Sequence, residues 1–242
     1  MENHIENKGV IISGASRGIG RATAIKFASS GCHVALLGRN EEDLNTTRDS
    51  CLQSGAGSAH VIPCDLSDIS SLAAVAMHCI EVLPSVDVLV NNAGIYYRGT
   101  VENAVLDDWD KLIDVNLRSV IHFTKYCIPA LTKNPRSAII NIASIAAKTT
   151  FVQGSVYCAS KHGLLGFAGG VFEDMRHLGV KVTTICPGFV NTGMVADRGL
   201  DPKKMIQVED IAETVFFAAN FPTTGCPTEI IIRPQIIPAM ER

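Results

Sequence analysis

The amino-acid sequence predicts an α/β protein with one doubly wound, parallel sheet of seven strands and helices on both of its faces. Short runs rich in β-branched residues alternate with longer helical stretches along the chain. The first run leads into a glycine-rich turn, and no linker-like or repetitive segment interrupts the alternation. Because such alternation implies parallel strands with right-handed crossovers, few topologies remain, and the doubly wound one has its nucleotide site at the carboxyl ends of the strands.

The pattern gives seven strands and six helices, and several of the helical stretches have Asp, Ser or Thr near their starts. The predicted strands are residues 9–13, 33–37, 59–64, 86–90, 138–142, 180–186 and 228–232. The predicted helices are residues 18–30, 41–54, 69–83, 106–131, 156–178 and 208–219.

Length and composition favour a single domain over residues 1–242. Hydrophobic residues make up 47% of the chain and charged residues 19%, which is enough apolar material for a buried sheet and too little charge for a disordered chain. The segment 189–207 contains Gly193, Gly199 and Pro202 and has no clear period. Because it falls between a strand and a helix at the carboxyl edge of the sheet, we expect a substrate lid there.

The charge pattern argues against large polyanionic partners. The formal net charge is −3 and Lys and Arg are scattered, so we expect neither nucleic acid nor a membrane surface as a partner. The chain lacks both a secretion-signal pattern at its start and an apolar run of roughly 18 to 20 residues, which predicts a cytoplasmic protein. The eight cysteines form no CxxC pair and the histidines show no metal-binding spacing, so we expect reduced thiols and no metal.

A glycine-rich turn, SGASRGIG at residues 13–20, joins the first strand to the first helix. Glycines let the backbone turn tightly and let a pyrophosphate approach the helix N-terminus, whose free N–H groups favour anions. The strand before the turn and the helix after it supply the context that a dinucleotide site requires. The candidate cofactor-binding residues here are Gly14, Ser16, Arg17, Gly18, Ile19 and Gly20.

The end of the second strand indicates which dinucleotide is bound. In NAD-binding proteins an acid at this point bonds a ribose hydroxyl, but here residues 36–40 read LLGRN. Arg39 is placed to meet a 2′-phosphate, and Arg17 can converge on the same group. The cofactor predicted is therefore NADP(H). The alternative is that both arginines are solvated surface residues.

Tyr157 and Lys161 lie four residues apart, which on a helix brings them to the same face. An ammonium beside a phenol favours the phenolate and so makes Tyr157 a better proton-transfer group near neutral pH. Such a pair also arises by chance on helix surfaces, and the spacing alone does not identify a site.

Two further polar residues are candidates for the same site. Ser144 follows the strand 138–142, where its hydroxyl could donate to the carbonyl oxygen that Tyr157 protonates, although a cap or turn serine is the common alternative. Asn116 lies in an apolar helix, where its amide needs partners; a buried network role and an ordinary satisfied core role are equally open. His162 points about 100° around the helix from Lys161, so we expect a packing or surface role for it.

Together these residues resemble the short-chain dehydrogenase/reductase family, over residues 8–229. Gly14, Gly18 and Gly20 match the glycine turn of that family. Its catalytic tetrad is matched by Asn116, Ser144, Tyr157 and Lys161. Its other cofactor-contacting positions are matched by Asp65, Leu66, Asn92, Ala93, Gly94, Pro187, Gly188, Val190 and Thr192.

The resemblance implies a Rossmann-type fold and an NADP(H)-dependent oxidoreductase. It implies that Tyr157 is the acid in reduction, that Ser144 orients the carbonyl, that Lys161 holds the nicotinamide ribose and favours the phenolate, and that Asn116 holds a water on a proton path. Helices 106–131 and 156–178 resemble the family's oligomer-forming pair, so we expect a homodimer or homotetramer.

The last strand departs from the Val-Asp-Gly-Gly ending of many family members, because residues 229–235 read EIIIRPQ. This ending is more similar to a subgroup that reduces 3-hydroxy-acid-type and miscellaneous carbonyl substrates than to the 3-oxoacyl-thioester reductases, which the chain otherwise matches substantially. The expected reaction is reduction of a small ketone, aldehyde or 3-oxoacyl compound to an alcohol. The alternative is a catalytically silent NADP(H)-binding module that senses redox state or binds a partner. Candidates for an apolar substrate wall, or for ordinary loop and core positions, are Tyr96, Tyr97, Phe151, Phe189 and Met194.

Overall fold

A computed structural model describes residues 4–239 of the chain. Its strands form a single parallel sheet with the order β3-β2-β1-β4-β5-β6-β7, which confirms the predicted α/β class and the doubly wound topology. The chain order reverses between β1 and β4, which are neighbours in the sheet. The strands are β1 Gly9–Ser13, β2 His33–Gly38, β3 Ser58–Pro63, β4 Val88–Asn91, β5 Ala138–Ile142, β6 Lys181–Pro187 and β7 Glu229–Ile232.

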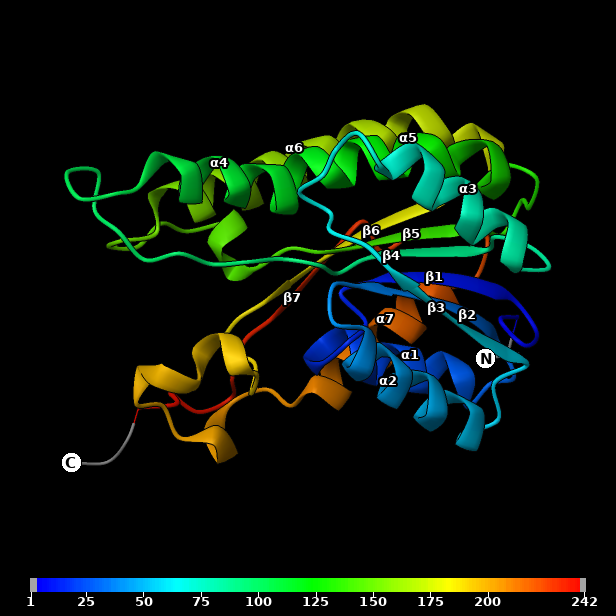
Figure 1. The fold of residues 1–242 in the computed structure, drawn as a ribbon, viewed down its shortest axis with the longest axis horizontal. Helices are drawn as coiled ribbons and strands as arrows, with labels where there is room; N and C mark the ends of the chain where they lie inside the picture. Colours follow the sequence, from blue (N-terminus) through cyan, green and yellow to red (C-terminus); the bar gives the residue numbers. More distant parts are fainter. Residues whose placement is uncertain (1–3, 240–242) are drawn as a thin grey trace.

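Helices cover both faces of the sheet, α3, α4, α5 and α6 on one and α1, α2 and α7 on the other (Figure 1). Over residues 4–239, none of them is long and apolar enough to cross a bilayer. The helices are α1 Gly18–Ala28, α2 Glu41–Gln53, α3 Leu72–Val82, α4 Leu106–Ile113, α5 Ser119–Leu131, α6 Ser155–Met175 and α7 Val208–Ala219.

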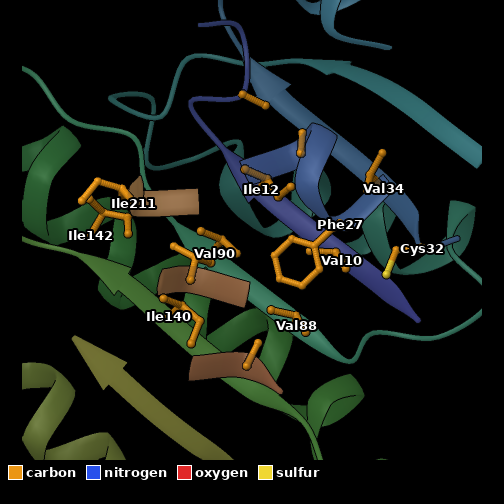
Figure 2. Close-up of a cluster of buried hydrophobic side chains, with 14 of the residues drawn as sticks. Val10, Ile12, Phe27, Cys32, Val34, Val88, Val90, Ile140, Ile142 and Ile211 are labelled. Atoms are coloured by element: carbon orange, nitrogen blue, oxygen red, sulfur yellow. The ribbon is translucent and has the colours of Figure 1, made fainter. Parts of the chain in front are cut away.

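Each face of the sheet has its own apolar core, because successive residues of a strand point to opposite faces. In β1, Val10 and Ile12 pack with Phe27 of α1, whereas Ile11 packs with Phe123 of α5 on the other face. Figure 2 shows the first of these clusters, with the ring of Phe27 beside Val10. Burial on both faces explains why the strands read as unbroken apolar runs. This burial also fixes the positions of the carboxyl ends of the strands, and the residues at these ends form the site described below.

Two predicted helices differ from the observed ones. The predicted helix 106–131 contains a π-helical turn, Asp114–Arg118, between α4 and α5. The hydrophobic periodicity of the sequence does not reveal the extra residue of such a turn, because the apolar faces of the helices before and after it still align approximately. The predicted helix 69–83 begins only at Leu72, since the carboxylate of Asp68 accepts hydrogen bonds from the backbone and hydroxyl of Ser70 and stabilises a turn there.

The segment 189–207 follows β6 and contains short 3₁₀ turns where the sequence showed no period. Backbone pairing between Val190 and Ile206 closes its base. The N–H of Asp201 donates to the carbonyl oxygen of Pro238 at 2.9 Å, so the end of the described chain lies along this segment, as the orange and red traces of Figure 1 show. The two turns are η4 Gly193–Arg198 and η5 Pro202–Lys204.

Candidate active site

A large cleft of about 1110 Å³ opens at the carboxyl ends of the strands. Parallel strands all end at the same edge of a sheet, so residues far apart in sequence meet there, at the point where the strand order reverses. The volume slightly exceeds the usual range for small-molecule sites, about 300–1,000 Å³, and suits a cofactor together with a small substrate.

The glycine turn packs directly against the loop that follows β4. Gly14 has a φ of +65°, in the left-handed region that favours glycine. A Cβ atom on Gly20 would collide with the carbonyl oxygen of Gly14 and would lie 2.6 Å from Nδ2 of Asn92. The same Nδ2 donates hydrogen bonds to the carbonyl oxygens of Ser13 at 2.9 Å and Gly14 at 3.2 Å. The turn and the loop are therefore held together with no room for larger side chains.

Ser13 completes this junction, although it is not among the predicted site residues. Its Oγ accepts hydrogen bonds from the backbone N–H groups of Asn92 at 3.0 Å and Ala93 at 3.1 Å. It also donates to the carbonyl oxygen of Val90 at 3.3 Å. A small hydroxyl residue at the end of a buried strand, directly before a glycine turn, is the signal that could have identified it.

The N-terminus of α1 opens into the cleft beside two arginines. The helix begins at Gly18 without an acid in its first turn, and both Arg17 and Arg39 line the cleft. Asp65 also lines it. Burial raises the pKa of the Asp65 carboxyl, but hydrogen bonds from Ser67 and the positive charge of Arg39 outweigh that effect and leave the pKa below its ordinary value. A helix N-terminus with flanking guanidinium groups is suited to phosphate groups.

Asn116 is fully buried in the π-helical turn and makes three hydrogen bonds through its amide. Its Oδ1 accepts from the N–H of Ile95 at 2.8 Å, and its Nδ2 donates to the carbonyl oxygen of Ile95 at 2.9 Å and to Oγ of Ser160 at 3.3 Å. The buried amide of Asn116 thus has its hydrogen-bond partners in the loop after β4, at Ile95, and on α6 at Ser160, the residue before Lys161. A π-helical turn frequently marks a functional site, where it re-aims one side chain.

Lys161 is the buried cation of the site, with only 4% of its surface exposed. Its Nζ donates to the carbonyl oxygen of Ile142 at 3.0 Å and lies 5.8 Å from the ring centre of Tyr157. Burial lowers the pKa of the Lys161 ammonium to about 8. The loop after β4 also passes beside it at Gly94, where an added Cβ atom would lie 3.6 Å from this Nζ. The predicted pairing of Lys161 with Tyr157 is therefore a contact inside the protein and not on a helix surface.

Ser144 and Tyr157 both line the cleft. Ser144 precedes a short 3₁₀ turn, Ile145–Ala147, and its Oγ accepts a hydrogen bond from the N–H of Ala146 at 3.1 Å. It is thus a cap serine, as the alternative interpretation held, and it faces the cleft as well. The hydroxyl is the acceptor in that bond, so its hydrogen is suited to donation to a ligand oxygen.

Aromatic rings surround Tyr157. The ring of Tyr96 lies perpendicular to it at 5.0 Å between centres, and that of Phe151 lies 6.5 Å away. The hydroxyl of Tyr96 donates to the carbonyl oxygen of Gln153 at 3.3 Å. Gln153 has a φ of +63°, a conformation that costs a residue other than glycine about 1–2 kcal/mol. Tyr96 therefore helps to hold the strained segment that leads into α6.

The loop after β6 faces the glycine turn. A Cβ atom on Gly18 would lie 3.4 Å from Cγ2 of Thr192, so the two loops approach each other closely. Gly188 lies under the end of the chain, because a Cβ atom there would lie 2.9 Å from Cδ of Pro234. Pro187, Gly188, Val190 and Thr192 all line the cleft.

Of the predicted site residues, all except Gly20 and Asn116 line the cleft. Gly20 packs against Gly14 within the glycine turn, and Asn116 is hydrogen-bonded to Ile95, which lines the cleft. Among the side chains that the structure describes, no group of three or more His, Cys, Asp or Glu is placed to hold a metal. Arg21 and Glu209 line the cleft and were missed. The first could have been found as the residue one helical turn after Arg17, whereas only the fold brings the second to the site.

Comparison with known proteins identifies the family. A model of the short chain dehydrogenase family matches residues 8–203. The chain belongs to the short-chain dehydrogenase family. An uncharacterized oxidoreductase of Staphylococcus epidermidis is 30% identical over 230 residues, which cover 95% of this chain and 98% of that protein. One from Staphylococcus haemolyticus is 29% identical over 224 residues, 93% of this chain and 96% of that protein. The resemblance to an oxidoreductase family is thereby confirmed.

Solved structures of other short-chain dehydrogenases superpose closely on this one. A metagenomic short-chain oxidoreductase in complex with NADP has a TM-score of 0.84 and 33% identity, covering 96% of this chain and 99% of that one. A short chain dehydrogenase from Burkholderia cenocepacia, also in complex with NADP, has a TM-score of 0.88 and 27% identity, covering 96% and 98%. The whole described fold is thus that of the family.

Replacing Gly20 with Ala should destabilise this short-chain dehydrogenase by about 2 kcal/mol, because the added methyl group has to displace the glycine turn or Asn92. Gly166→Ala on α6 is the matched control, since no described atom lies within 4 Å of a Cβ placed there. It should stabilise the protein by up to about 1 kcal/mol. Urea unfolding measures both changes, and equal stability of the two variants would contradict the packing described at the turn.

Burial of Lys161 should make the stability of the ligand-free protein depend on pH. The pKa of Lys161 falls from about 10.5 in the unfolded chain to about 8 in the folded one, so the unfolded chain binds more protons between these values. The free energy of unfolding should therefore rise between about pH 8 and 10.5, by about 3 kcal/mol. Lys161→Met removes this contribution, and the difference between the two unfolding curves isolates it. A difference independent of pH over this interval would show that the ammonium is not desolvated.

Proposed function

We propose that this short-chain dehydrogenase reduces a carbonyl compound to an alcohol with NADPH, using Tyr157 as the proton donor. The observation that carries the proposal is the phenol of Tyr157 in the cleft beside the buried ammonium of Lys161, with Ser144 lining the same cleft. A structural role does not explain why a lysine is buried at a cost to stability, whereas proton transfer by the neighbouring phenol does.

The described residues fit a phosphorylated dinucleotide. The glycine turn and the N-terminus of α1 suit the pyrophosphate, and Arg17 and Arg39 suit a 2′-phosphate. The NADP complexes of the two structural relatives support the same choice. When bound, NADPH supplies the hydride. The other residues proposed to hold it are Gly14, Ser16, Gly18, Ile19, Gly20, Asp65, Leu66, Asn92, Ala93, Gly94, Tyr157, Lys161, Pro187, Gly188, Val190 and Thr192.

The reacting residues have separate tasks. Tyr157 donates its phenolic proton to the substrate oxygen, and Ser144 donates a hydrogen bond to the same oxygen and so stabilises the developing alkoxide. The Lys161 ammonium favours the phenolate that Tyr157 becomes once the proton has left. Asn116 acts indirectly, because its bonds to Ile95 and Ser160 hold the loop and the helix on either side of Lys161.

Tyr157→Phe tests the proposed chemistry. The variant keeps the ring and its packing but lacks the proton, so kcat for NADPH oxidation with a ketone and aldehyde panel should fall by about a hundredfold or more. Tyr126→Phe on α5 is the matched control and should retain full activity. Undiminished turnover by Tyr157→Phe would refute the assignment, and NADPH binding by a folded protein that reduces no carbonyl compound would favour the silent binding module.

Arg39→Asp tests the cofactor. The substitution replaces a guanidinium that lines the cleft with a carboxylate, so the KM for NADPH should rise about tenfold or more while the KM for NADH stays level or falls. Arg176→Asp changes the net charge equally at an exposed position at the end of α6 and should alter neither value. Steady-state kinetics with both cofactors measure the effect. Equal use of NADPH and NADH by the unmodified protein would contradict the role of Arg39.

A further inference from the structure

The two ends of the cleft differ in chemistry. Where the chain leaves β4, β5 and β6, the cleft is lined by Tyr96, Tyr97, Phe151, Phe189 and Met194, which we call the aromatic end. Strands β5 and β6 are neighbours, and Ile142 pairs with Ile185. Phe189 lies two residues after β6 and Ser144 lies two residues after β5. Both residues are therefore at the same edge of the sheet. The aromatic end is thus where a substrate would lie when its carbonyl oxygen meets Ser144 and Tyr157.

The aromatic end offers apolar surface to a ligand. Phe151 is 40% exposed, Phe189 38% and Met194 47%, although all three line a concave site. Tyr96 and Phe151 pack against each other at 6.3 Å between ring centres, and the hydroxyl of Tyr96 is bonded to the carbonyl oxygen of Gln153. Covering these side chains with an apolar group gains free energy in proportion to the area removed from water, and an aromatic group adds edge-to-face contacts.

The cations that line the cleft are not residues of the aromatic end. Among the described side chains they are Arg17, Arg21, Arg39 and Lys161. Arg39 follows β2, which is three strand spacings from β5, or about 14 Å. The Nε of Arg21 donates to Oγ1 of Thr47 on α2, and the ammonium of Lys161 is buried against a backbone carbonyl. A carboxylate that lies among the side chains of the aromatic end would therefore lose its water without gaining an ionic partner from these four cations, which is unfavourable.

We propose that the substrate is an uncharged ketone or aldehyde that carries an aromatic ring or a bulky apolar group next to its carbonyl. This inference rests on the proposed carbonyl reduction. The carbonyl carbon gains a hydride from NADPH and the oxygen gains a proton from Tyr157, so that the products are a neutral alcohol and NADP⁺. Carbonyl compounds that carry a carboxylate in or on the group that would lie at the aromatic end, such as short 3-oxo acids or a carboxylate-substituted aryl ketone, are then poor substrates.

The experiment compares substrates that differ in one property. Methyl 4-acetylbenzoate and 4-acetylbenzoate share the ring and the ketone and differ in charge, whereas acetophenone and butanone differ in the ring. The kcat/KM of the full chain with NADPH should favour the ester over the acid, and acetophenone over butanone, by about tenfold or more in each pair. Equal or reversed preference in the first pair overturns the exclusion of charge, and in the second pair it overturns the preference for a ring.

Two variants locate the preference at the aromatic end. Phe151→Ala should reduce the acetophenone-to-butanone ratio by about tenfold. Phe189→Arg, which supplies the missing cation, should raise the acid-to-ester ratio by a similar factor. The matched controls are Val152→Ala and Val152→Arg, because Val152 is 85% exposed and does not line the cleft. If the controls change the ratios as much as the variants do, the assignment to these side chains is wrong.

The failure of this inference is distinguishable from failure of the proposed function. Tyr157-dependent NADPH oxidation that prefers 4-acetylbenzoate to its ester would leave carbonyl reduction standing and refute the substrate class. A folded protein that binds NADPH and reduces neither these four compounds nor any member of the ketone and aldehyde panel would refute both. Thermal unfolding of each variant establishes that it is folded, and the exposure of Phe151 and Phe189 makes loss of the fold unexpected.

Discussion

The close packing of the glycine turn against the loop after β4 is the constraint on which the rest of the site depends. These two loops follow adjacent strands from which the helices leave toward opposite faces of the sheet, and this divergence creates the crevice. Gly14 and Gly20 allow the backbones to touch, and Asn92 ties them through its side-chain amide. Once the junction is made, the N-terminus of α1 points into the cleft and Gly94 passes beside Lys161.

A second set of contacts joins the loop after β4 and the end of β5 to α6. Asn116 joins the loop after β4 to Ser160, and Lys161 bonds to the end of β5 through Ile142. A buried polar network whose members all have partners is rigid, because breaking any one bond leaves an unpaired polar group away from water. The position of Tyr157 is therefore set by polar bonds on one side of its helix and by aromatic packing on the other. The desolvated ammonium is the part of the arrangement that reduces stability.

The sequence predicted features that depend on local pattern and missed those that depend on the fold. Val10, Ile11 and Ile12 read as a strand because both faces of the sheet are covered. Tyr157 and Lys161 were paired by helical spacing alone. The bond from Asn116 to Ile95 spans 21 residues and that from Tyr96 to Gln153 spans 57, and no periodic signal links residues so far apart. The π-helical turn was not predicted, because one added residue hardly disturbs the spacing of apolar residues along the sequence.

The uneven distribution of charge along the cleft separates the proposed cofactor site from the proposed substrate site. The arginines and the helix N-terminus lie with β1 and β2, where regular elements hold them, whereas the aromatic end is built largely from the loops after β4, β5 and β6. The loop after β6 is tied to the end of the chain by the bond between Asp201 and Pro238. The tail whose sequence departs from the common family ending also contacts this loop, because the N–H of Gly188 donates to the carbonyl oxygen of Ile232 at 2.7 Å and Pro234 lies against Gly188. Changes in the tail can therefore move the loop after β6 without replacing a contact of Tyr157 or Lys161, which lie on α6.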